Sequence, residues 1–501
     1  MTSPPPRRAP LDLSPDEFRA LGHDLVDRIA DFLGSWPNRP VTRGAAPSAI
    51  RALVPARPLP EDGAAPEALL RDAAALLTEH SLHNGHPRFF GYITSSAAPI
   101  GMLGDLLAAA VNPNVGGYAL SPVATEIERQ TVAWIAEMIG LPKTTGGILV
   151  SGGNMANFVG FLVARRIKAG WDVRGGGVAA PGAHRLRVYT SAETHTWIEK
   201  ATDLFGLGTE AIRWIPTDRN LRMDVAALRR AIDDDIHAGH KPMLVVGTAG
   251  SVSTGAVDPL DRIHDVCREY GLWFHVDGAY GAFAAAVPSE RARFAGLAEA
   301  DSVALDAHKW LYAPLEASCA LVRDPEALHD TFCFHPPYYR MDEIGGEPAT
   351  NFHEYGPQNS RGFRALKIWL ALQQVGRAGY VRMIGDDIAL TRRLYDAVKA
   401  EPDLEAFTCD LSIATFRYAP RAFAAGASDR EARLNELNET LLARLQDGGE
   451  AFVSNAVMNG TFALRTCIVN FRTSEADVLA LPKIVARVGR ETAAERKEKP
   501  S

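Results

Sequence analysis

Short apolar runs alternate with helix-like segments through the middle of the chain, from about residue 86 to residue 324. A strand that is apolar at every position is buried on both faces, and such strands are typical of a parallel sheet with helices above and below it. The pattern therefore predicts an α/β fold with a mostly parallel central sheet and helices on both faces. The predicted strands are residues 147–150, 186–190, 243–247, 272–276, 302–305 and 318–322.

The N-terminal region carries a separate helix signal. Ser14-Pro15-Asp16-Glu17 places a capping hydroxyl, a proline at the first helical position and a glutamate three residues after the cap. Apolar residues then recur at helical spacing to about Trp36, which predicts one helix with a single apolar stripe. Residues 37–66 are rich in proline and alanine and predict an extended connector. A stripe without a partner in its own chain predicts contact with a second subunit, and hence a homodimer.

The C-terminal part predicts a smaller α+β unit. Residues 333–358 are rich in Pro, Tyr, Gly and Glu without periodicity and predict a long, mobile loop. A helix over 363–375 leads into this unit, and the charged end, 491–501, is expected to fray. Within the unit we expect a helix over 431–445 and strands over 452–455 and 462–465. The predicted domains are an N-terminal helix and strap over 1–85, a large domain over 86–375 and a small domain over 376–501.

Composition narrows the class of partner. The chain has 501 residues, of which 47% are hydrophobic and 23% charged, as is ordinary for a globular enzyme. A formal net charge of −7 argues against nucleic-acid binding, which needs a basic face. No stretch offers the roughly 20 uncharged apolar residues of a membrane span, and the five cysteines include no Cys-x-x-Cys pair. We therefore expect a cytoplasmic protein with a small-molecule partner, without a membrane segment, disulfide framework or zinc site.

Two predicted strand ends carry the candidate chemistry. Asp277 follows the run Leu272–Val276, and Lys309 follows the next run, in His308-Lys309-Trp310. Ligands of such a sheet bind at the carboxyl ends of its strands. A lysine amine can hold an aldehyde as a Schiff base, and a carboxylate can keep a pyridine nitrogen protonated so that the ring accepts electrons. Together, Lys309 and Asp277 indicate pyridoxal 5'-phosphate as the cofactor.

Other residues can reach the same edge of the sheet. Gly153 and Asn154 lie between a predicted strand and a helix, where backbone N–H groups and the helix dipole attract phosphate. His195 follows another predicted strand, so its imidazole can stack on a cofactor ring. His308 directly precedes the lysine and can donate to the phosphate.

Each of these residues also has a structural interpretation. A strand-end aspartate such as Asp277 often caps a loop, and a buried lysine such as Lys309 can simply pair with a carboxylate. His195 can be a surface or capping histidine, and His308 can be satisfied by backbone groups. Glycine turns between strands and helices are common for packing reasons. The glycine turn, His195, Asp277 and Lys309 follow one another in this order along the chain, and the set of four favours the cofactor.

Four sequence blocks resemble the pyridoxal-phosphate-dependent group II decarboxylases, the family of aromatic-L-amino-acid, glutamate and histidine decarboxylases, and the aromatic branch in particular. The resemblance covers most of the chain, and the last two blocks in order are the most specific. The blocks are His86-Pro87-Arg88-Phe89-Phe90-Gly91-Tyr92, Ser121-Pro122 through Glu126-Ile127-Glu128, His275-Val276-Asp277-Gly278-Ala279-Tyr280 and His308-Lys309-Trp310.

The resemblance implies a fold-type I enzyme that decarboxylates an L-amino acid, with aromatic substrates favoured, to the amine and carbon dioxide through a quinonoid intermediate. It implies that Lys309 forms the internal aldimine, that Asp277 partners the pyridine nitrogen and that His195 stacks on the ring. It also implies a homodimer with the active site near the subunit interface, and a tyrosine on a mobile loop, here Tyr338, that protonates the product carbon. The remaining implied cofactor contacts are Gly153, Asn154, Asp306 and His308 at the phosphate and Ala279 under the ring.

Two rival functions remain open at this point. The first is a decarboxylation-coupled oxidative deaminase that makes an aldehyde, for which Tyr338 is the discriminating residue. The second is a catalytically inactive homologue that serves as a binding or scaffold protein, against which the intact Lys309, Asp277 and His195 argue.

Asp306 is an acid near an expected phosphate dianion, so we expect its carboxylate to be turned away from the phosphate or paired with a cation.

Overall fold

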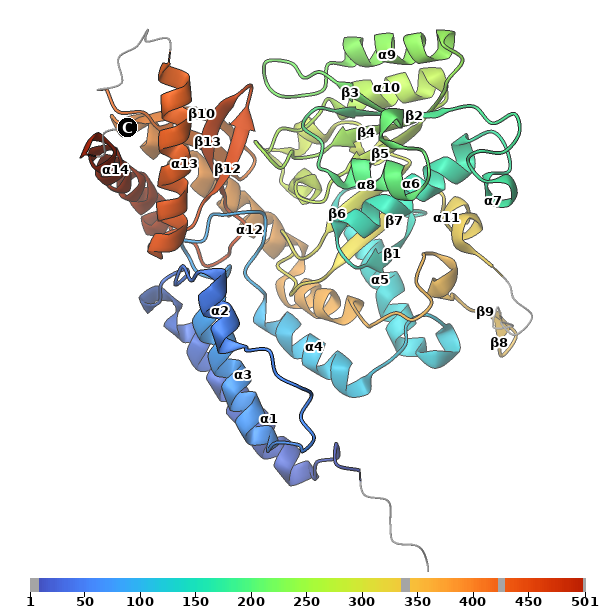
Figure 1. Ribbon diagram of the computed structural model, residues 1–501. Helices are drawn as coiled ribbons and strands as arrows, with labels where there is room; N and C mark the ends of the chain where they lie inside the picture. The colour runs from blue at the N-terminus through green and yellow to red at the C-terminus, as the bar shows by residue number, and fades with distance from the viewer. Residues whose placement is uncertain (1–8, 335–342, 422–428, 499–501) are drawn as a thin grey trace, which may run out of the picture.

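The computed structural model describes residues 9–334, 343–421 and 429–498 (Figure 1). Its central sheet has seven strands in the spatial order β1-β7-β6-β5-β4-β2-β3. Strands β2 to β6 pair in parallel, and β7 runs antiparallel to both of its neighbours. The predicted mostly parallel sheet is confirmed. The strands are β1 (Gly146–Val150), β2 (Leu186–Ser191), β3 (Ile212–Ile215), β4 (Lys241–Thr248), β5 (Trp273–Asp277), β6 (Ser302–Asp306) and β7 (Ser318–Val322).

Strand β3 was not among the predicted strands. Its two central residues are Arg213, which pairs with Asp235 at 2.7 Å, and Trp214, which is 44% exposed. These residues interrupt the apolar run because β3 lies at the edge of the sheet, where only part of the strand is buried.

Helices cover both faces of the central sheet, as predicted. Leu149 and Phe274 point into the core on one face, whereas their neighbours Ile148 and Trp273 point into the core on the other. Successive strand residues point to opposite faces, so a run that is apolar throughout packs on both sides. One face is covered by α5 (Pro122–Met138), α9 (Val225–His237) and α10 (Leu260–Tyr270), and the other by α6 (Gly153–Lys168), α8 (Trp197–Leu204) and α11 (Pro325–Phe332).

A second sheet, of four antiparallel strands in the order β10-β11-β13-β12, lies in the C-terminal part. Leu394, Leu441 and Val485 pack three helices against it. The first of these helices changes direction at Gly376, whose φ of 67° and ψ of 166° are not helical. The prediction that the chain frays from residue 491 is wrong, since the last helix continues to Glu498. The elements are α12 (Ala365–Ala400), β10 (Leu404–Asp410), β11 (Ile413–Tyr418), α13 (Arg430–Gly448), β12 (Ser454–Met458), β13 (Thr461–Cys467) and α14 (Glu475–Glu498).

The N-terminal helices project from the rest of the molecule, and α1 and α3 lie side by side (Figure 1). The predicted first helix is confirmed, including its capping box at Ser14 and Glu17. The prediction of an extended connector over 37–66 is wrong in part, because a short helix forms within it and another begins at its end. Pro47 and Pro66 begin these helices at a position where a missing backbone N–H costs nothing. The bounds are α1 (Pro15–Ser35), α2 (Pro47–Leu53) and α3 (Pro66–His80).

The remaining elements are short or peripheral. The predicted loop over 333–358 has little regular structure in its described part, with a two-strand ribbon and one 3-10 turn. Within the described parts of the chain, the helices lack a stretch long and apolar enough to cross a bilayer. These elements are α4 (Pro99–Val111), α7 (Val173–Gly176), β8 (Glu343–Ile344), β9 (Glu347–Pro348) and the 3-10 helix η7 (Phe352–Glu354).

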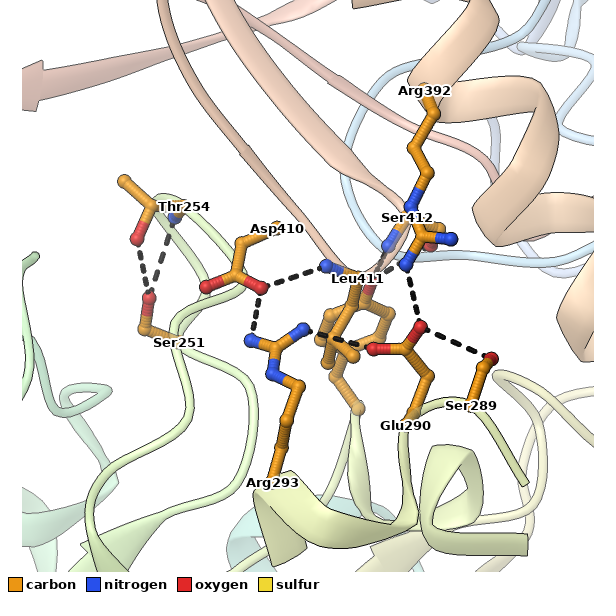
Figure 2. A network of polar contacts seen from close by, with 10 residues as sticks. Ser251, Thr254, Ser289, Glu290, Arg293, Arg392, Asp410, Leu411 and Ser412 are labelled. Atoms are coloured by element: carbon orange, nitrogen blue, oxygen red, sulfur yellow. Dashed lines mark hydrogen bonds and ion pairs between the residues drawn. The ribbon is translucent and has the colours of Figure 1, made fainter. Parts of the chain in front are cut away.

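A polar network around the buried carboxylate of Glu290 joins the C-terminal sheet to the loops of the large sheet (Figure 2). Arg293 bridges Glu290 in the large unit and Asp410 at the end of β10. Arg392 on α12 reaches the same Glu290 at 2.6 Å, and the Glu290 side chain is 2% exposed. Because a buried carboxylate needs cationic partners, the two arginines fix the two units against each other.

Candidate active site

A cavity of about 480 Å³ lies at the carboxyl ends of the central strands, and part of its wall comes from β12 and β13 of the second sheet. Asp277 ends β5 and Asp306 ends the adjacent, parallel β6, so the two strands deliver their carboxylates to the same edge. The cavity brings together most of the predicted site residues. They are Gly153, Asn154, His195, Asp277, Ala279, Asp306 and Lys309.

Two predicted residues are not in this set. His308 does not line the cavity; its Nδ1 lies 2.9 Å from the carbonyl oxygen of Ala317, which is the backbone contact of its structural interpretation. Burial lowers the pKa of His308, so the neutral imidazole is favoured. Tyr338 lies outside the described residues.

Lys309 is fixed in a tight turn after β6. Its backbone N–H donates to the carbonyl of Asp306 at 3.0 Å, and its Nζ lies 2.9 Å from Oδ2 of the same residue. The next residue, Trp310, is fully buried, stacks on Tyr280 at 4.7 Å and donates to Asp387 at 3.0 Å. The anchored indole of Trp310 therefore holds the backbone of Lys309, whose side chain is 17% exposed and lines the cavity.

Asp277 is a buried carboxylate with two donors of its own. The backbone N–H of Ala279 donates to Oδ1 at 3.2 Å, and the indole Nε1–H of Trp197 donates to Oδ2 at 2.8 Å. Burial raises the pKa of Asp277, and the positive charge of Lys309 opposes that shift. Trp197 was missed by the sequence analysis, because nothing local indicates that the start of α8 reaches the end of β5.

Asp306 is paired, as its expected place beside a phosphate requires. It accepts hydrogen bonds from Ser318 and Lys309. Burial alone opposes its ionisation, but the positive charge of Lys309 and the hydrogen bonds from Ser318 and Lys309 outweigh burial and hold the pKa of Asp306 below its ordinary value. Its carboxylate faces the start of α6 so closely that a Cβ added to Gly153 would lie 2.8 Å from Oδ2. Only glycine leaves the backbone of this helix start accessible.

His195 lies on the exposed rim of the cavity. Its Nδ1 accepts a hydrogen bond from the backbone N–H of Trp197 at 3.3 Å. In the neutral ring the proton is therefore on Nε2.

Further polar side chains line the cavity that the sequence analysis did not name. Arg465 on β13 is 5% exposed and donates to Ser454 at 2.9 Å. Burial lowers the pKa of Arg465. Glu193 lies near the rim, where burial raises the pKa of its carboxyl and a hydrogen bond from Ser253 opposes the rise. No local signal marks Arg465, since it reaches the cavity only through the docking of the second sheet.

The residues fit pyridoxal phosphate. The cavity has the volume of a small-ligand site. It contains one lysine amine for the aldehyde, one buried carboxylate for the pyridine nitrogen and, for the phosphate, a helix that starts at a glycine and so leaves its first backbone N–H groups accessible. Fold and site together define a pyridoxal-phosphate enzyme of the α/β class.

Comparison with known proteins specifies the family. The model of the pyridoxal-dependent decarboxylase conserved domain matches residues 47–418. An aromatic-L-amino-acid decarboxylase of Bacillus atrophaeus is 32% identical over 94% of this chain and 95% of its own. A phenylacetaldehyde synthase of a Rosa hybrid cultivar is 29% identical over 94% of each chain. The crystal structure of Oryza sativa TDC with PLP and tryptamine is similar with a TM-score of 0.88 at 29% identity, covering 97% of this chain and 99% of that chain.

The chain belongs to the pyridoxal-dependent decarboxylase family, and it is a pyridoxal-phosphate-dependent amino-acid decarboxylase. The family resemblance, the fold class and the cofactor predicted from the sequence are confirmed.

Proposed function

We propose that this decarboxylase acts on an aromatic L-amino acid and releases the corresponding amine. The observation that carries the proposal is the meeting of Lys309 and Asp277 in one cavity, in a chain whose relatives include an aromatic-L-amino-acid decarboxylase and a tyrosine decarboxylase. The apolar part of the cavity wall, with Tyr92, Ile93 and Val252, suits an aromatic side chain.

The residues that would hold the cofactor follow from their positions. When bound, pyridoxal phosphate supplies an aldehyde for amines and a ring that accepts the electron pair left when carbon dioxide departs. Lys309 would hold the aldehyde, and the start of α6 at Gly153 and Asn154 would hold the phosphate. Asp277 would keep the proton on the pyridine nitrogen, with Trp197 fixing the orientation of the carboxylate.

The rim residues would position the substrate. Nε2–H of His195 would lie over the ring from the open side, and Ala279 would pack beneath it. Arg465 provides a buried cation that attracts the substrate carboxylate into the cavity. Asp306 and His308 would lie near the phosphate, where the carboxylate of Asp306 pairs with the ammonium group of Lys309.

A substrate panel tests this proposal. We expect carbon dioxide release from tryptophan, tyrosine, phenylalanine or 3,4-dihydroxyphenylalanine to exceed release from glutamate by at least about tenfold in kcat/KM, the discrimination that one apolar pocket supplies. Faster turnover of glutamate than of every aromatic amino acid would refute the aromatic preference. An absorbance band of the bound cofactor in the purified protein separates an enzyme from an inactive scaffold.

Product identity is a separate question, because the relatives include phenylacetaldehyde synthases. We propose the amine as the product and Tyr338 as the residue that protonates the product carbon. Tyr338→Phe is expected to shift the product from amine towards aldehyde in a product assay in air, with dissolved dioxygen as the two-electron oxidant that is reduced to hydrogen peroxide, and water releasing the nitrogen as ammonia. The neighbouring Tyr339→Phe serves as the control. An unchanged amine yield in Tyr338→Phe would remove this role.

We also propose a homodimer formed through the N-terminal helices. α1 and α4 line a groove of about 790 Å³ whose wall is mostly apolar. Phe18, Leu103 and Leu106 in this groove are 61%, 54% and 54% exposed. A contiguous apolar surface of this kind marks a protein interface. The predicted homodimer is therefore supported, and sedimentation at several concentrations tests it.

A reducing compartment such as the cytoplasm is proposed from the thiols. All five cysteines lie in the described parts of the chain, where none of them forms a disulfide, and three of them are buried. Secreted proteins more often join such residues in disulfides. Cell fractionation against compartment markers tests this assignment.

A further inference from the structure

A second cluster of ligand-type side chains lies outside the cavity, where the end of α11 meets η7. It consists of His329, Cys333 and Glu354, whose ligand atoms all lie within 4.8 Å of one another. We propose that this cluster binds a divalent metal ion, zinc in particular.

The end of α11 positions two of the three ligands. His329 and Cys333 are four residues apart, so their side chains project from the same side of the helix. The N–H of Cys333 donates to the carbonyl of His329 at 2.8 Å, which continues the helical geometry through the cysteine. Arg174 donates to the carbonyl oxygens of Thr331 and Cys333 at 3.0 and 3.2 Å and so fixes the helix end.

The third ligand comes from η7, which is anchored independently. The backbone N–H of His353 donates to Gly116 at 2.9 Å. Phe352 is buried, and the guanidinium of Arg361 lies 5.0 Å from its ring centre. The carboxylate of Glu354 is therefore held in place, and its side chain is 7% exposed.

The two oxygens of Glu354 face the two other ligands separately. Oε2 lies 3.8 Å from Nε2 of His329, and Oε1 lies 3.9 Å from Sγ of Cys333. Zinc bonds of about 2.0 to 2.3 Å in a tetrahedron place neighbouring ligand atoms about 3.3 to 3.7 Å apart. The observed separations need only small side-chain rotations to reach that geometry.

The kinds of ligand select the metal. Thiolate and imidazole together favour zinc over magnesium or calcium, which prefer oxygen ligands. Binding replaces the proton of the Cys333 thiol, which leaves to solvent, so the affinity is expected to rise with pH. Three protein ligands leave a fourth position for water. Glu354 lies 21 residues after Cys333, and this separation explains why a search for paired cysteines predicted no zinc site.

The cluster shares no residue with the lining of the Lys309 cavity. The proposal therefore does not rest on the substrate or product of the enzyme. Its tests use the metal alone as the probe and do not require turnover.

Metal titration of the chelator-treated holoenzyme tests the site. We expect Zn²⁺ to bind with a stoichiometry of about one ion per chain. Co²⁺ is expected to give the intense red-end visible bands of a four-coordinate thiolate site, away from the cofactor's absorbance. Cys333→Ser and His329→Ala should abolish these bands, and Cys409→Ser should keep them. Equal Co²⁺ spectra for the wild type and Cys333→Ser would overturn the proposal.

Alkylation of the unmodified chain provides a test that does not depend on any variant folding. Cys333 and Cys409 are the two half-buried cysteines, and the other three are buried. Zn²⁺ is expected to slow iodoacetamide labelling of Cys333 by at least about tenfold, because the metal-bound thiolate is no longer a free nucleophile. Labelling of Cys409, measured by mass spectrometry in the same sample, should not change. An unprotected Cys333 at saturating Zn²⁺ contradicts the site.

Discussion

The cavity around Lys309 buries charged side chains, whereas the N-terminal helices leave apolar side chains exposed. In the cavity, Asp277 and Asp306 are 7% and 3% exposed, and each accepts hydrogen bonds from donors of the same chain. In α1, α2 and α3 no residue is buried, and Phe18 is 61% exposed. A buried charge is tolerated only with partners around it, so the cavity charges are matched within one chain. An exposed apolar stripe gains stability only from another surface.

Removing Lys309 is expected to give the largest effect on the cavity side of this comparison. Lys309→Ala deletes the amine that would hold the cofactor and the partner of Asp306. We expect the rate of carbon dioxide release to fall at least about 1,000-fold, the scale on which a covalent nucleophile is lost. Lys399→Ala removes an exposed lysine paired with Asp396 and is the control. A Lys309→Ala enzyme with more than a tenth of the wild-type rate is the contrary outcome.

Charging the N-terminal groove is expected to give the next effect. Phe18→Asp combined with Leu103→Asp places two carboxylates where the proposed interface is apolar. The dissociation constant of the dimer is expected to rise by roughly 100-fold or more, equivalent to about 3 kcal/mol. Sedimentation velocity measures the change, and Leu59→Asp, in the connector and 90% exposed, is the matched control. If the double variant and the Leu59→Asp control sediment alike, the interface lies elsewhere.

The same contrast explains which features were predictable from the sequence. Asp277 and Lys309 follow buried strands that are mostly apolar, so local pattern alone places them at one edge of a sheet. Trp197 reaches Asp277, and Arg465 reaches the cavity, through contacts between distant elements, and no local pattern encodes such contacts. The sequence predicts neither the helix that begins at Pro47 nor the one that begins at Pro66, because the composition of a short segment does not distinguish a proline that starts a helix from one in a connector.

Trp197 offers a finer test of how well the cavity charges are matched. Its indole N–H stabilises the ionised form of Asp277. Trp197→Phe removes that donor, so the already raised pKa of Asp277 is expected to rise further and the acid limb of the pH–rate profile to move to higher pH. We expect kcat to fall about tenfold, in line with the loss of one hydrogen bond to a charged group.

The control for Trp197 is Trp171→Phe, which removes an indole hydrogen bond to the carbonyl of Gly177, away from the cavity. Absorbance of the bound cofactor as a function of pH supplies a second readout, because a purely structural role for Trp197 would leave that titration unmoved. A lower rate with an unshifted pH profile would assign Trp197 to packing alone.

The smallest expected effect concerns Asp387, which lies behind Lys309 and accepts hydrogen bonds from Trp310 and Tyr312 at 3.0 and 2.8 Å. Burial raises the pKa of Asp387 to about 8 from an ordinary 3.8, against the opposing effect of these hydrogen bonds. Between those two values the folded chain binds more protons than the unfolded chain, so the free energy of unfolding falls as pH rises. The exposed carboxyl of Glu17 in α1 gives the opposite dependence of stability on pH, because its hydrogen bonds with Ser14 lower its pKa.

Asp387→Asn keeps an oxygen acceptor for both donors but removes the titration. We expect its urea midpoint to change less than that of the wild type between about pH 5 and about pH 8.5. Asp396→Asn, at an exposed position of the same helix, should retain the wild-type slope. Equal slopes for Asp387→Asn and the wild type would mean that the carboxyl behind Lys309 titrates alike in the folded and unfolded chains. The contrast between a cavity built around buried charge and helices that bury no charge would then not extend to the core behind the lysine.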